Sequence, residues 1–564
     1  MQQFKDLNYS RPSLVKVKAE FKSHLAAFRA AKSFEEADGA MCRWEDLMSR
    51  VTTQYCIAYI RNTIDTNDAF YEGEIRFYDT NLPKLMLLVK KCGKVMLASP
   101  YLPEFKKKYG EKMFKDLEVQ QKLVNLRIML PSIRENKLCT TYAKLTAGCS
   151  TEFRGEKCNF YGLLRHMQST DREERREAFL AWSGMYEKIA PELDRIYGEM
   201  VALRRKIAKN LGFGSYIDYV YLSRGRYDYT KKEIAEFREA VRTYITPVCA
   251  RLYAEQAERL GLSELQWYDE DLVYPEGNPL PQGTPDELVE KAREMYRALS
   301  PETGEFFDFM VENRMFDLLT RDGKRQGGYC THLPDYKAPF IFSNFNGTSA
   351  DIDVLTHEAG HAFEYYYASR RLPLDDLSHS TSEINEIHSM TLEMLTYPYM
   401  DKFFGENADR YRYAHFCDAL RTIPYLVSVD EFQHRVFENP QSGPEDWRRY
   451  WREIEAKYMP WRHYEGSAFL EGGGFWMQKQ HVFLFPFYYV DYALAQLGAF
   501  SIYRRQVENG DAWERYLNLC SMGGMYGYFE TLDKAGIPRP LDPQTVRETA
   551  EFVSDMAERF KKKL

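Results

Sequence analysis

The sequence predicts a mainly α-helical protein with one small β-sheet, and three observations lead to this fold class. Long segments, among them residues 33–62 and 170–212, are rich in helix-forming residues and place apolar side chains three or four positions apart. Strand-like sequence is sparse and is found at residues 327–333 and 338–347. A chain of 564 residues can form two to four domains or one large multi-lobed enzyme.

The predicted helices follow one another along most of the chain. Helical sequence over residues 170–212 is expected to break near Pro191, because proline lacks a backbone donor and clashes with the preceding turn. A second long stretch, residues 231–262, is expected to be interrupted at Pro247 for the same reason. Residues 274–287 contain four prolines and two glycines and predict a connector, with helix resuming at its last proline.

Composition and charge argue against several kinds of partner. The net charge is -7 and the pI is about 6.0, so nothing indicates a nucleic-acid or membrane-surface partner. No stretch approaches the ~18 apolar residues of a membrane span, and the N-terminus lacks the apolar core of a signal peptide. The ten cysteines form no C-x-x-C pair, which argues against a disulfide framework or a zinc ribbon. We therefore expect a cytoplasmic protein.

The motif that carries chemistry is His-Glu-Ala-Gly-His at residues 357–361, which we expect on a helix that follows the short sheet. On a helix, His357 and His361 lie on one face with Cβ atoms about 5–6 Å apart, so both imidazoles can bind one Zn²⁺. Glu358 is placed to act as a general base on water at the metal. With 11 histidines in the chain, roughly 0.02 chance matches are expected, so chance is a weak explanation.

A catalytic zinc needs a third protein ligand, and the sequence directs the search to a later helix. One zinc-protease pattern continues with glycine and histidine, but here Glu364 and Tyr367 occupy those positions. The next suitable stretch is residues 378–397, where Glu386 and Glu393 stand two helical turns apart on one face. Glu386 can then bind the metal, while Glu393 can accept the other ring N–H of a ligand histidine.

Two further histidines near this helix remain alternative ligands. His379 precedes the helix, and His388 is two residues after Glu386 and therefore points to a different face. Capping, core or hydrogen-bonding roles are the competing interpretations for both. Ser380 and Glu383 have the spacing of a capping box, which predicts the helix start.

Together these segments resemble the thimet-oligopeptidase-like zinc metallopeptidases, and most of all oligoendopeptidase F and Pz-peptidase. "HEAGH" is followed 25 residues after its second histidine by "EIHS", and the preceding "GGYC" and "PFIFSNFNGTSADIDVLT" look like the family's strands before its zinc helix. "LRRKIAKNLGF" and "PFYYVDYALAQLGA" are similar to further family segments. The resemblance covers residues 190–564 well, so we expect an N-terminal helical domain at residues 1–190 and a zinc peptidase domain at 191–564.

The resemblance implies a zinc endopeptidase that cleaves internal bonds of short, unfolded peptides. It implies a helical ellipsoid split by a deep substrate channel, with the N-terminal domain as one wall and folded proteins excluded by size. It also implies one Zn²⁺ per chain, held by His357, His361 and Glu386, with Glu358 activating water. The cleavage preference, the physiological peptide and the oligomeric state do not follow from it.

The resemblance also implies a second group of site residues near the C-terminus. His481, Tyr489 and Tyr492 correspond to the family's oxyanion and substrate donors, and Tyr488 is a further substrate-binding candidate. Phe485 stands where thimet-type relatives carry another tyrosine. Taken from the residues alone, tyrosines at this helical spacing are more typical of a core than of a site.

Two other segments are candidates for contact with substrate. The strand containing Phe340, Ser343 and Asn344 can pair with an extended peptide as an added strand. Three consecutive glycines, Gly472 to Gly474, fit either a mobile loop beside the site or an ordinary turn.

Two functions compete with an endopeptidase. A zinc aminopeptidase uses the same metal set, and it requires an acidic group that grips the substrate amine. A helical peptide-binding or scaffold protein, in which zinc is absent or structural, is the alternative from another class. Peptides with a blocked N-terminus distinguish an aminopeptidase from an endopeptidase. A metal assay of the purified protein distinguishes a binding or scaffold protein from a zinc enzyme.

Overall fold

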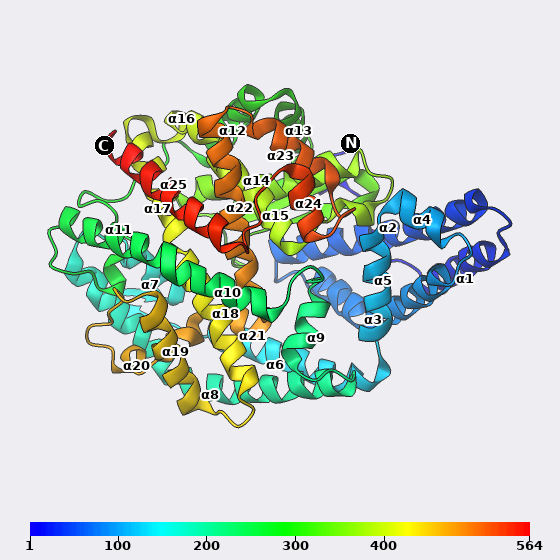
Figure 1. The fold of residues 1–564 in the computed structure, drawn as a ribbon, viewed down its shortest axis with the longest axis horizontal. Coiled ribbons are helices and arrows are strands. Elements are labelled where there is room, and N and C mark those ends of the chain that lie inside the picture. The colour runs from blue at the N-terminus through cyan, green and yellow to red at the C-terminus, as the bar shows by residue number, and fades with distance from the viewer. The chain divides into compact units, whose positions relative to one another are not determined.

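A computed structural model describes residues 1–564, apart from the side chain of Leu126. Both compact units of the chain are largely helical (Figure 1), and each is assembled from three separate segments. Unit 1 comprises Met1–Val124, Leu280–Ala408 and Ser501–Pro538. Unit 2 comprises Asn125–Pro279, Asp409–Phe500 and Arg539–Leu564. The mainly helical fold class predicted from the sequence is confirmed.

Unit 1 contains the N-terminal helices, the three-stranded sheet and the His-Glu-Ala-Gly-His motif. Its helices are α1 Leu14–Ala30, α2 Phe34–Ile64, α3 Ala69–Leu97, α4 Leu102–Tyr109, α5 Glu111–Leu123, α12 Pro285–Leu299, α13 Pro301–Glu312, α14 Ala350–Ser369, α15 Ser382–Leu395, α16 Asp401–Phe404, α23 Ala512–Met522 and α24 Tyr528–Ala535. Its strands are β3 Phe316–Leu319, β4 Tyr329–Leu333 and β5 Ala338–Phe345.

Each N-terminal helix of unit 1 buries an apolar face, and α2 and α3 begin at side-chain caps. Ser33 accepts a hydrogen bond from the backbone of Glu36 at the start of α2, and Asp68 caps α3 in the same way. The buried faces of α1 to α5 form one hydrophobic cluster, which includes Phe21, Trp44 and other apolar side chains. This cluster surrounds a cavity of about 310 Å³ between α2, α3 and α5.

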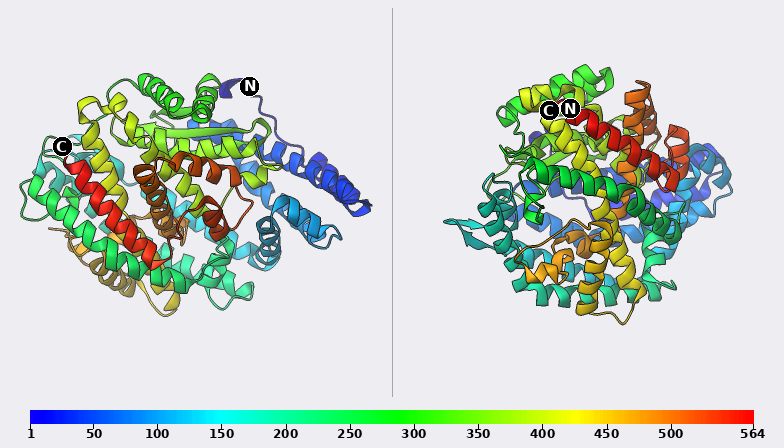
Figure 2. Two further views of the ribbon diagram at one scale, coloured as in Figure 1. Left: turned by 45° about the horizontal axis from the view of Figure 1, so that its top comes forward. Right: turned by 60° about the vertical axis from the view of Figure 1, so that its left-hand side comes forward.

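The sheet of unit 1 has the strand order β3-β5-β4, with β5 parallel to β3 and antiparallel to β4. Strand β5 is buried at every residue except Asn344, as expected of a central strand with both edges paired. The sheet packs against α14, and Figure 2 shows its strands next to that helix. Both strands predicted from the sequence are therefore confirmed, whereas the short β3 was missed.

A tight junction connects β5 to the helix that carries the motif. The Asp351 carboxylate accepts hydrogen bonds from the backbone N–H groups of Asn346 (2.9 Å) and Gly347 (2.8 Å). Gly347 has a φ of 84°, a conformation that favours glycine. Because Asp351 lies in the first turn of α14, this contact sets the direction in which the helix leaves the sheet.

Unit 2 is built from long helices and one short hairpin. Its elements are α6 Met129–Ala147, β1 Thr151–Phe153, β2 Glu156–Cys158, α7 Phe160–His166, α8 Arg172–Asn210, α9 Tyr216–Ser223, α10 Lys231–Ala240, α11 Thr246–Arg259, α18 Ile423–Glu438, α19 Pro444–Tyr458, α20 Ala468–Glu471, α21 Gln480–Leu484 and α25 Pro543–Lys561. Two helices cross the boundaries between the units in the sequence. Helix α17, Ala408–Arg421, begins at the last residue of the second unit 1 segment, and α22, Tyr489–Glu508, ends within the third unit 1 segment.

Of the two expectations about proline in unit 2, the break at Pro191 was wrong, and the interruption near Pro247 is present but begins a few residues earlier. Helix α8 continues through Pro191 without a break, so the missing donor is accommodated inside one long helix. The boundary predicted after residue 190 accordingly falls within α8. The second long stretch is interrupted before Pro247, by a π-helical turn at Val241–Ile245, and the proline itself occupies the first turn of α11.

The triple glycine forms an ordinary turn rather than a loop with free space around it. Gly473 has a φ of 95°, and a Cβ atom there would lie 2.1 Å from the carbonyl oxygen of Arg448. The close packing requires glycine at this position. Among the described helices, none combines the length and the apolar character needed to cross a lipid bilayer.

Candidate metal centre

The two histidines of the motif project from one face of α14. Their ring centroids are 5.0 Å apart, and the ring planes are nearly perpendicular at 87°. The side chain of His357 is 27% exposed and that of His361 is 22% exposed, so solvent reaches both imidazoles. Glu358, between them, is also half-buried. The helix therefore presents two ring nitrogens and one carboxylate at an accessible position.

Helix α15 lies next to α14 (Figure 1). It brings a carboxylate to both imidazoles. Oε2 of Glu386 lies 3.5 Å from Nε2 of His357 and 3.5 Å from Nε2 of His361. One ligand atom from each of the three residues lies within 4.8 Å of the others. Two imidazole nitrogens and one carboxylate oxygen are the donor set that catalytic zinc sites use.

The close approach of the two helices depends on a glycine within the motif. A Cβ atom on Gly360 would lie 2.5 Å from Cα of Ser389 and 3.0 Å from the carbonyl oxygen of His388. Any larger residue would push α15 away from α14. The motif therefore supplies both the ligands and the space for the second helix. Sequence reasoning did not identify this role for Gly360.

Glu393 holds the other side of the first imidazole. Its Oε1 lies 2.5 Å from Nδ1 of His357, two helical turns after Glu386 on α15. A hydrogen bond at Nδ1 fixes the tautomer that leaves Nε2 free to bind a metal. Glu386 and Glu393 therefore lie on the same face of α15, toward the histidines, as their spacing in the sequence predicts.

The electrostatics of the group favour a cation. Burial lowers the pKa of His357, but the hydrogen bonds and charges of Glu386 and Glu393 outweigh it and hold that pKa well above its usual value. Burial alone would raise the pKa of Glu386, yet the two histidines hold it well below its usual range. The surroundings therefore stabilise positive charge between these side chains, and the donor chemistry fits Zn²⁺.

Space beside Glu358 comes from the loop before β4. A Cβ atom on Gly328 would lie 3.9 Å from Oε1 of Glu358 and 3.4 Å from the carbonyl oxygen of Phe342. Gly328 therefore lies next to the Glu358 carboxylate and places no side chain of its own there. The glycine pair in "GGYC" was available as a sequence signal, but its relation to Glu358 depends on the fold.

The predicted substrate strand is corrected by the sheet topology. Phe340 is 1% exposed and packs on Phe4, with ring centroids 4.4 Å apart. Its strand is central, so the backbone at Ile341 and Phe342 is paired with β3 on one side and β4 on the other. An extended peptide therefore cannot add at these residues. Ser343 is buried, and the Asn344 amide donates to the carbonyl oxygens of residues 325 and 327.

The aromatic candidates form a cluster of their own in unit 2. The ring of His481 lies 4.6 Å from that of Tyr489 and 6.4 Å from that of Tyr492, and the Tyr488 and Tyr492 rings are 5.0 Å apart. Their helix is anchored by Asp491, whose buried carboxylate pairs with the guanidinium groups of two arginines, Arg224 and Arg226. The roles that the resemblance implies for these residues stay predictions.

A lysine that sequence reasoning missed lies in the same cluster. The Lys479 ammonium is 5.1 Å from the Tyr489 ring centroid and 5.5 Å from that of Tyr425. Burial lowers the pKa of Lys479 to about 8. No spacing rule identifies such a residue, because its surroundings come from separate helices.

The two alternative histidine ligands have other surroundings. Nε2 of His379 lies 3.1 Å from Nε2 of His332, and His388 is buried at 1% exposure. The predicted capping box is wrong, since α15 begins at Ser382 with Thr381 as its N-cap and no side-chain cap hydrogen bond. Neither alternative histidine belongs to the group around His357.

Comparison with known proteins places the chain in a family. The model of "Peptidase family M3" matches residues 165–278 and 302–551, and that of the "Peptidase M3 N-terminal domain" matches residues 4–124. A solved structure of Pz peptidase A with an inhibitor is 40% identical, with a TM-score of 0.93 and 99% coverage of both chains.

Two curated relatives are more distant in sequence. Oligopeptidase PepF of Bacillus subtilis (strain 168) is 25% identical over 315 residues, and that alignment spans 52% of this chain and 45% of the relative. The plasmid oligoendopeptidase F of Lactococcus lactis subsp. cremoris is 23% identical over 588 residues, which span 94% of this chain and 93% of the relative. Because the family model matches more than half of the sequence, the chain belongs to peptidase family M3, in the branch of oligoendopeptidase F and Pz peptidase.

Proposed function

We propose that this protein is a zinc-dependent oligopeptidase that hydrolyses internal bonds of short peptides. The observation that supports the proposal most directly is the convergence of His357, His361 and Glu386 from two helices onto one point. These three residues would hold the zinc ion, and Glu393 would orient His357 through Nδ1. A zinc ion held there would act as a Lewis acid, which polarises the scissile carbonyl and lowers the pKa of a water molecule.

Glu358 performs the proton transfers in this proposal. Its carboxylate accepts a proton from the attacking water and returns it to the amine nitrogen of the leaving group. Gly328 lies next to that carboxylate and adds no side chain that would cover it. Hydrolysis therefore needs no covalent intermediate on the protein, and one side chain serves first as base and then as acid.

The names of the relatives support peptides as substrates, and the donors that hold them are proposed from the sequence resemblance. The relatives carry the names oligopeptidase and oligoendopeptidase, which indicate short peptides as the substrate class. We assign His481, Tyr489 and Tyr492 as donors to the oxyanion or the substrate, and Tyr488 as a substrate contact. Replacing Tyr489 or Tyr492 by phenylalanine is expected to lower kcat by roughly 10²–10³-fold where the hydroxyl meets the oxyanion.

The decisive variant is Glu358→Gln. It keeps the shape of the side chain but cannot accept a proton, so turnover is expected to fall by about 10²–10⁴-fold while zinc content stays unchanged. Glu364→Gln on the same helix is the matched control, because burial holds the pKa of Glu364 well above its usual value and an amide resembles the neutral acid. Full activity in Glu358→Gln would remove the general-base assignment.

Peptide mixtures separate endopeptidase from aminopeptidase activity. Short peptides of graded length, with free and with blocked N-termini, are incubated with and without a chelator and read by mass spectrometry. The proposal expects chelator-sensitive cleavage at internal bonds that persists when the N-terminus is blocked. Cleavage confined to free N-termini would instead identify an aminopeptidase, and metal-independent binding without cleavage would identify a peptide-binding protein.

A further inference from the structure

We propose that unit 1 contains a second site for a divalent transition metal ion, formed by His332, Asp375 and His379. His332 lies on β4, Asp375 opens the short 3₁₀ turn Asp375–Ser378, and His379 follows it before α15. One ligand atom of each lies within 4.8 Å of the others. None of these residues belongs to the group around His357, and the inference does not depend on peptide hydrolysis.

The geometry of this group is close to that of the candidate zinc centre. Nε2 of His332 lies 3.1 Å from Nε2 of His379 and 3.9 Å from Oδ2 of Asp375. Two atoms bound to one metal at about 2.1 Å are about 3.4 Å apart in a tetrahedral site, and the observed separations bracket that value. The corresponding separations at Glu386 are 3.5 Å. Small side-chain movements therefore suffice to bring the three donors to a common ion.

Surrounding contacts orient the proposed ligands as supporting residues do at known metal sites. The Tyr365 hydroxyl donates to Oδ1 of Asp375 at 2.7 Å, which leaves Oδ2 directed at the histidines. The Tyr365 ring stacks on His379, with an interplanar angle of 13°, and packs on His332 with ring centroids 4.5 Å apart. Because Tyr365 is one helical turn beyond His361 on α14, the same helix supports both sites.

Burial favours the neutral form of both imidazoles. Burial lowers the pKa of His332 well below its usual value, and it also lowers that of His379. Neutral imidazole is the form that binds a metal, and a bound ion would replace the hydrogen bond between the two Nε2 atoms. The His332 side chain is 25% exposed and that of Asp375 is 22% exposed, which leaves a path for an ion and for water ligands.

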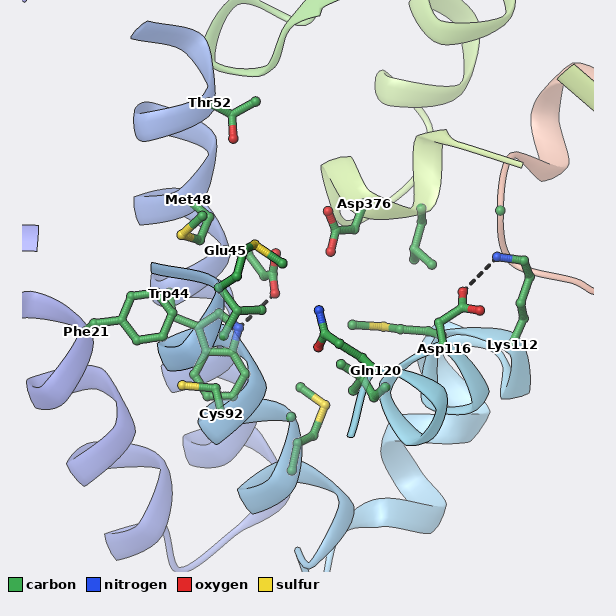
Figure 3. A pocket seen from close by; sticks show the side chains of 18 residues that line it. Phe21, Trp44, Glu45, Met48, Thr52, Cys92, Lys112, Asp116, Gln120 and Asp376 are labelled. Atoms are coloured by element: carbon green, nitrogen blue, oxygen red, sulfur yellow. Dashed lines mark hydrogen bonds and ion pairs between the residues drawn. The ribbon is translucent and has the colours of Figure 1, made fainter. Parts of the chain in front are cut away.

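Carboxyl groups with raised pKa values lie near the proposed site, together with the Lys112 ammonium. Asp376 lines the cavity between α2, α3 and α5, and Glu45 lies across it on α2 (Figure 3). Burial, and after it the charge of Asp376, raises the pKa of Glu45 to about 8, and Asp375 contributes in the same direction. The raised pKa means that the neutral acid is favoured when no cation is present. A divalent ion at the proposed site would favour the charged form of these carboxyl groups.

The donor set indicates which ions fit. Two imidazoles and one carboxylate with open positions suit first-row transition metals such as Zn²⁺, rather than Mg²⁺ or Ca²⁺, which prefer oxygen ligands. A bound ion would join edge strand β4 to the segment that leads into α15. It would therefore stabilise the connection between the sheet and the helix that carries Glu386.

Direct hydrogen bonding between the two histidines is the competing explanation, and glutamine variants separate it from metal binding. Glutamine places an amide nitrogen or oxygen near the position of Nε2, so His332→Gln and His379→Gln can keep a hydrogen bond but are poor metal ligands. The full-length protein is stripped with a chelator, titrated with Zn²⁺ and assayed for zinc per chain. His24→Gln, on α1, is the matched control outside both sites.

We expect two zinc equivalents in the wild type and in His24→Gln, and one in His332→Gln and in His379→Gln. Tyr365→Phe is expected to keep both equivalents but to weaken the second by about 10–100-fold. Circular dichroism of the metal-free proteins checks that the variants fold. Uptake of a single equivalent by the wild type would overturn the proposal. A second equivalent that survives in both glutamine variants would also overturn it, since the ion would then lie elsewhere, for example at Glu156, Cys158 and His166.

Discussion

At the scale of single residues, one side chain fixes the orientation of the His357 ring. Glu393 binds Nδ1 and thereby orients Nε2 toward Glu386. Replacing Glu393 by alanine removes that contact, and we expect zinc affinity to fall by about 10–100-fold, as for other partners of metal-bound histidines. Zinc competition against a chromogenic chelator measures the change.

A graded series sharpens this prediction. Glu393→Gln keeps an acceptor oxygen but loses the negative charge, so its zinc affinity is expected between those of the wild type and Glu393→Ala. The unfolding temperatures of the metal-free proteins serve as the control for general damage. Equal zinc affinity in all three proteins would show that Glu393 does not support the ligand.

Lys479 gives a residue-scale prediction that depends on pH. Burial lowers its folded-state pKa to about 8, whereas the unfolded value is about 10.4. Below pH 8 the buried ammonium is charged in the folded state and destabilises it. From about pH 8 to 10.4 the unfolded state binds more protons, so this destabilisation disappears as pH rises. Lys479→Met should therefore raise the unfolding temperature at pH 7.

The pH series for Lys479→Met uses differences from the wild type, because other groups titrate in both proteins. The gain in unfolding temperature is expected to shrink steadily between pH 8 and pH 10. A gain that stays constant over this interval would mean that the ammonium is not the cause. Differential scanning calorimetry at fixed ionic strength provides the measurement.

Between elements, the distance from α14 to α15 controls whether Glu386 reaches the histidines. Gly360→Ala puts a Cβ atom 2.5 Å from Cα of Ser389, so the helices must separate. We expect a loss of about 1–3 kcal/mol in the free energy of unfolding, together with weaker zinc binding. Chemical denaturation and zinc titration measure the two effects.

A second glycine in unit 1 offers a matched comparison. Gly73 lies inside α3, and no atom is within 4 Å of a Cβ placed there. Gly73→Ala should therefore raise the free energy of unfolding by about 0.4–1 kcal/mol and leave zinc binding unchanged. Similar effects of both substitutions would contradict the argument from helix spacing.

For the whole molecule, metal binding and folding are linked. An ion that binds the folded state at 100 times its Kd stabilises that state by about 2.7 kcal/mol. Chelation should accordingly lower the unfolding temperature by about a few degrees. Calorimetry with and without a chelator tests this, and the effect should be smaller in a His357→Ala, His361→Ala double variant, in which only the second proposed site can hold an ion. An equal effect in that variant would assign the stabilising ion to another site.

Much of the candidate site could be predicted from local sequence. The spacing of His357 and His361 places them on one helix face, and the spacing of Glu386 and Glu393 does the same on the next helix. The prediction at Pro191 failed because a long helix packed on several neighbours can accommodate one missing hydrogen bond. The substrate-strand prediction failed because strand order is a non-local property.

The sequence by itself determined the helical character, the donor residues and their order along the chain, because these depend on side-chain type and on helical period. Only the tertiary structure decided which donors meet. Gly360 lets α15 approach, β5 is central rather than free, and His379 lies against His332 instead of the candidate zinc centre. Such contacts join residues far apart in sequence, and packing selects them from many pairings that the same local patterns allow.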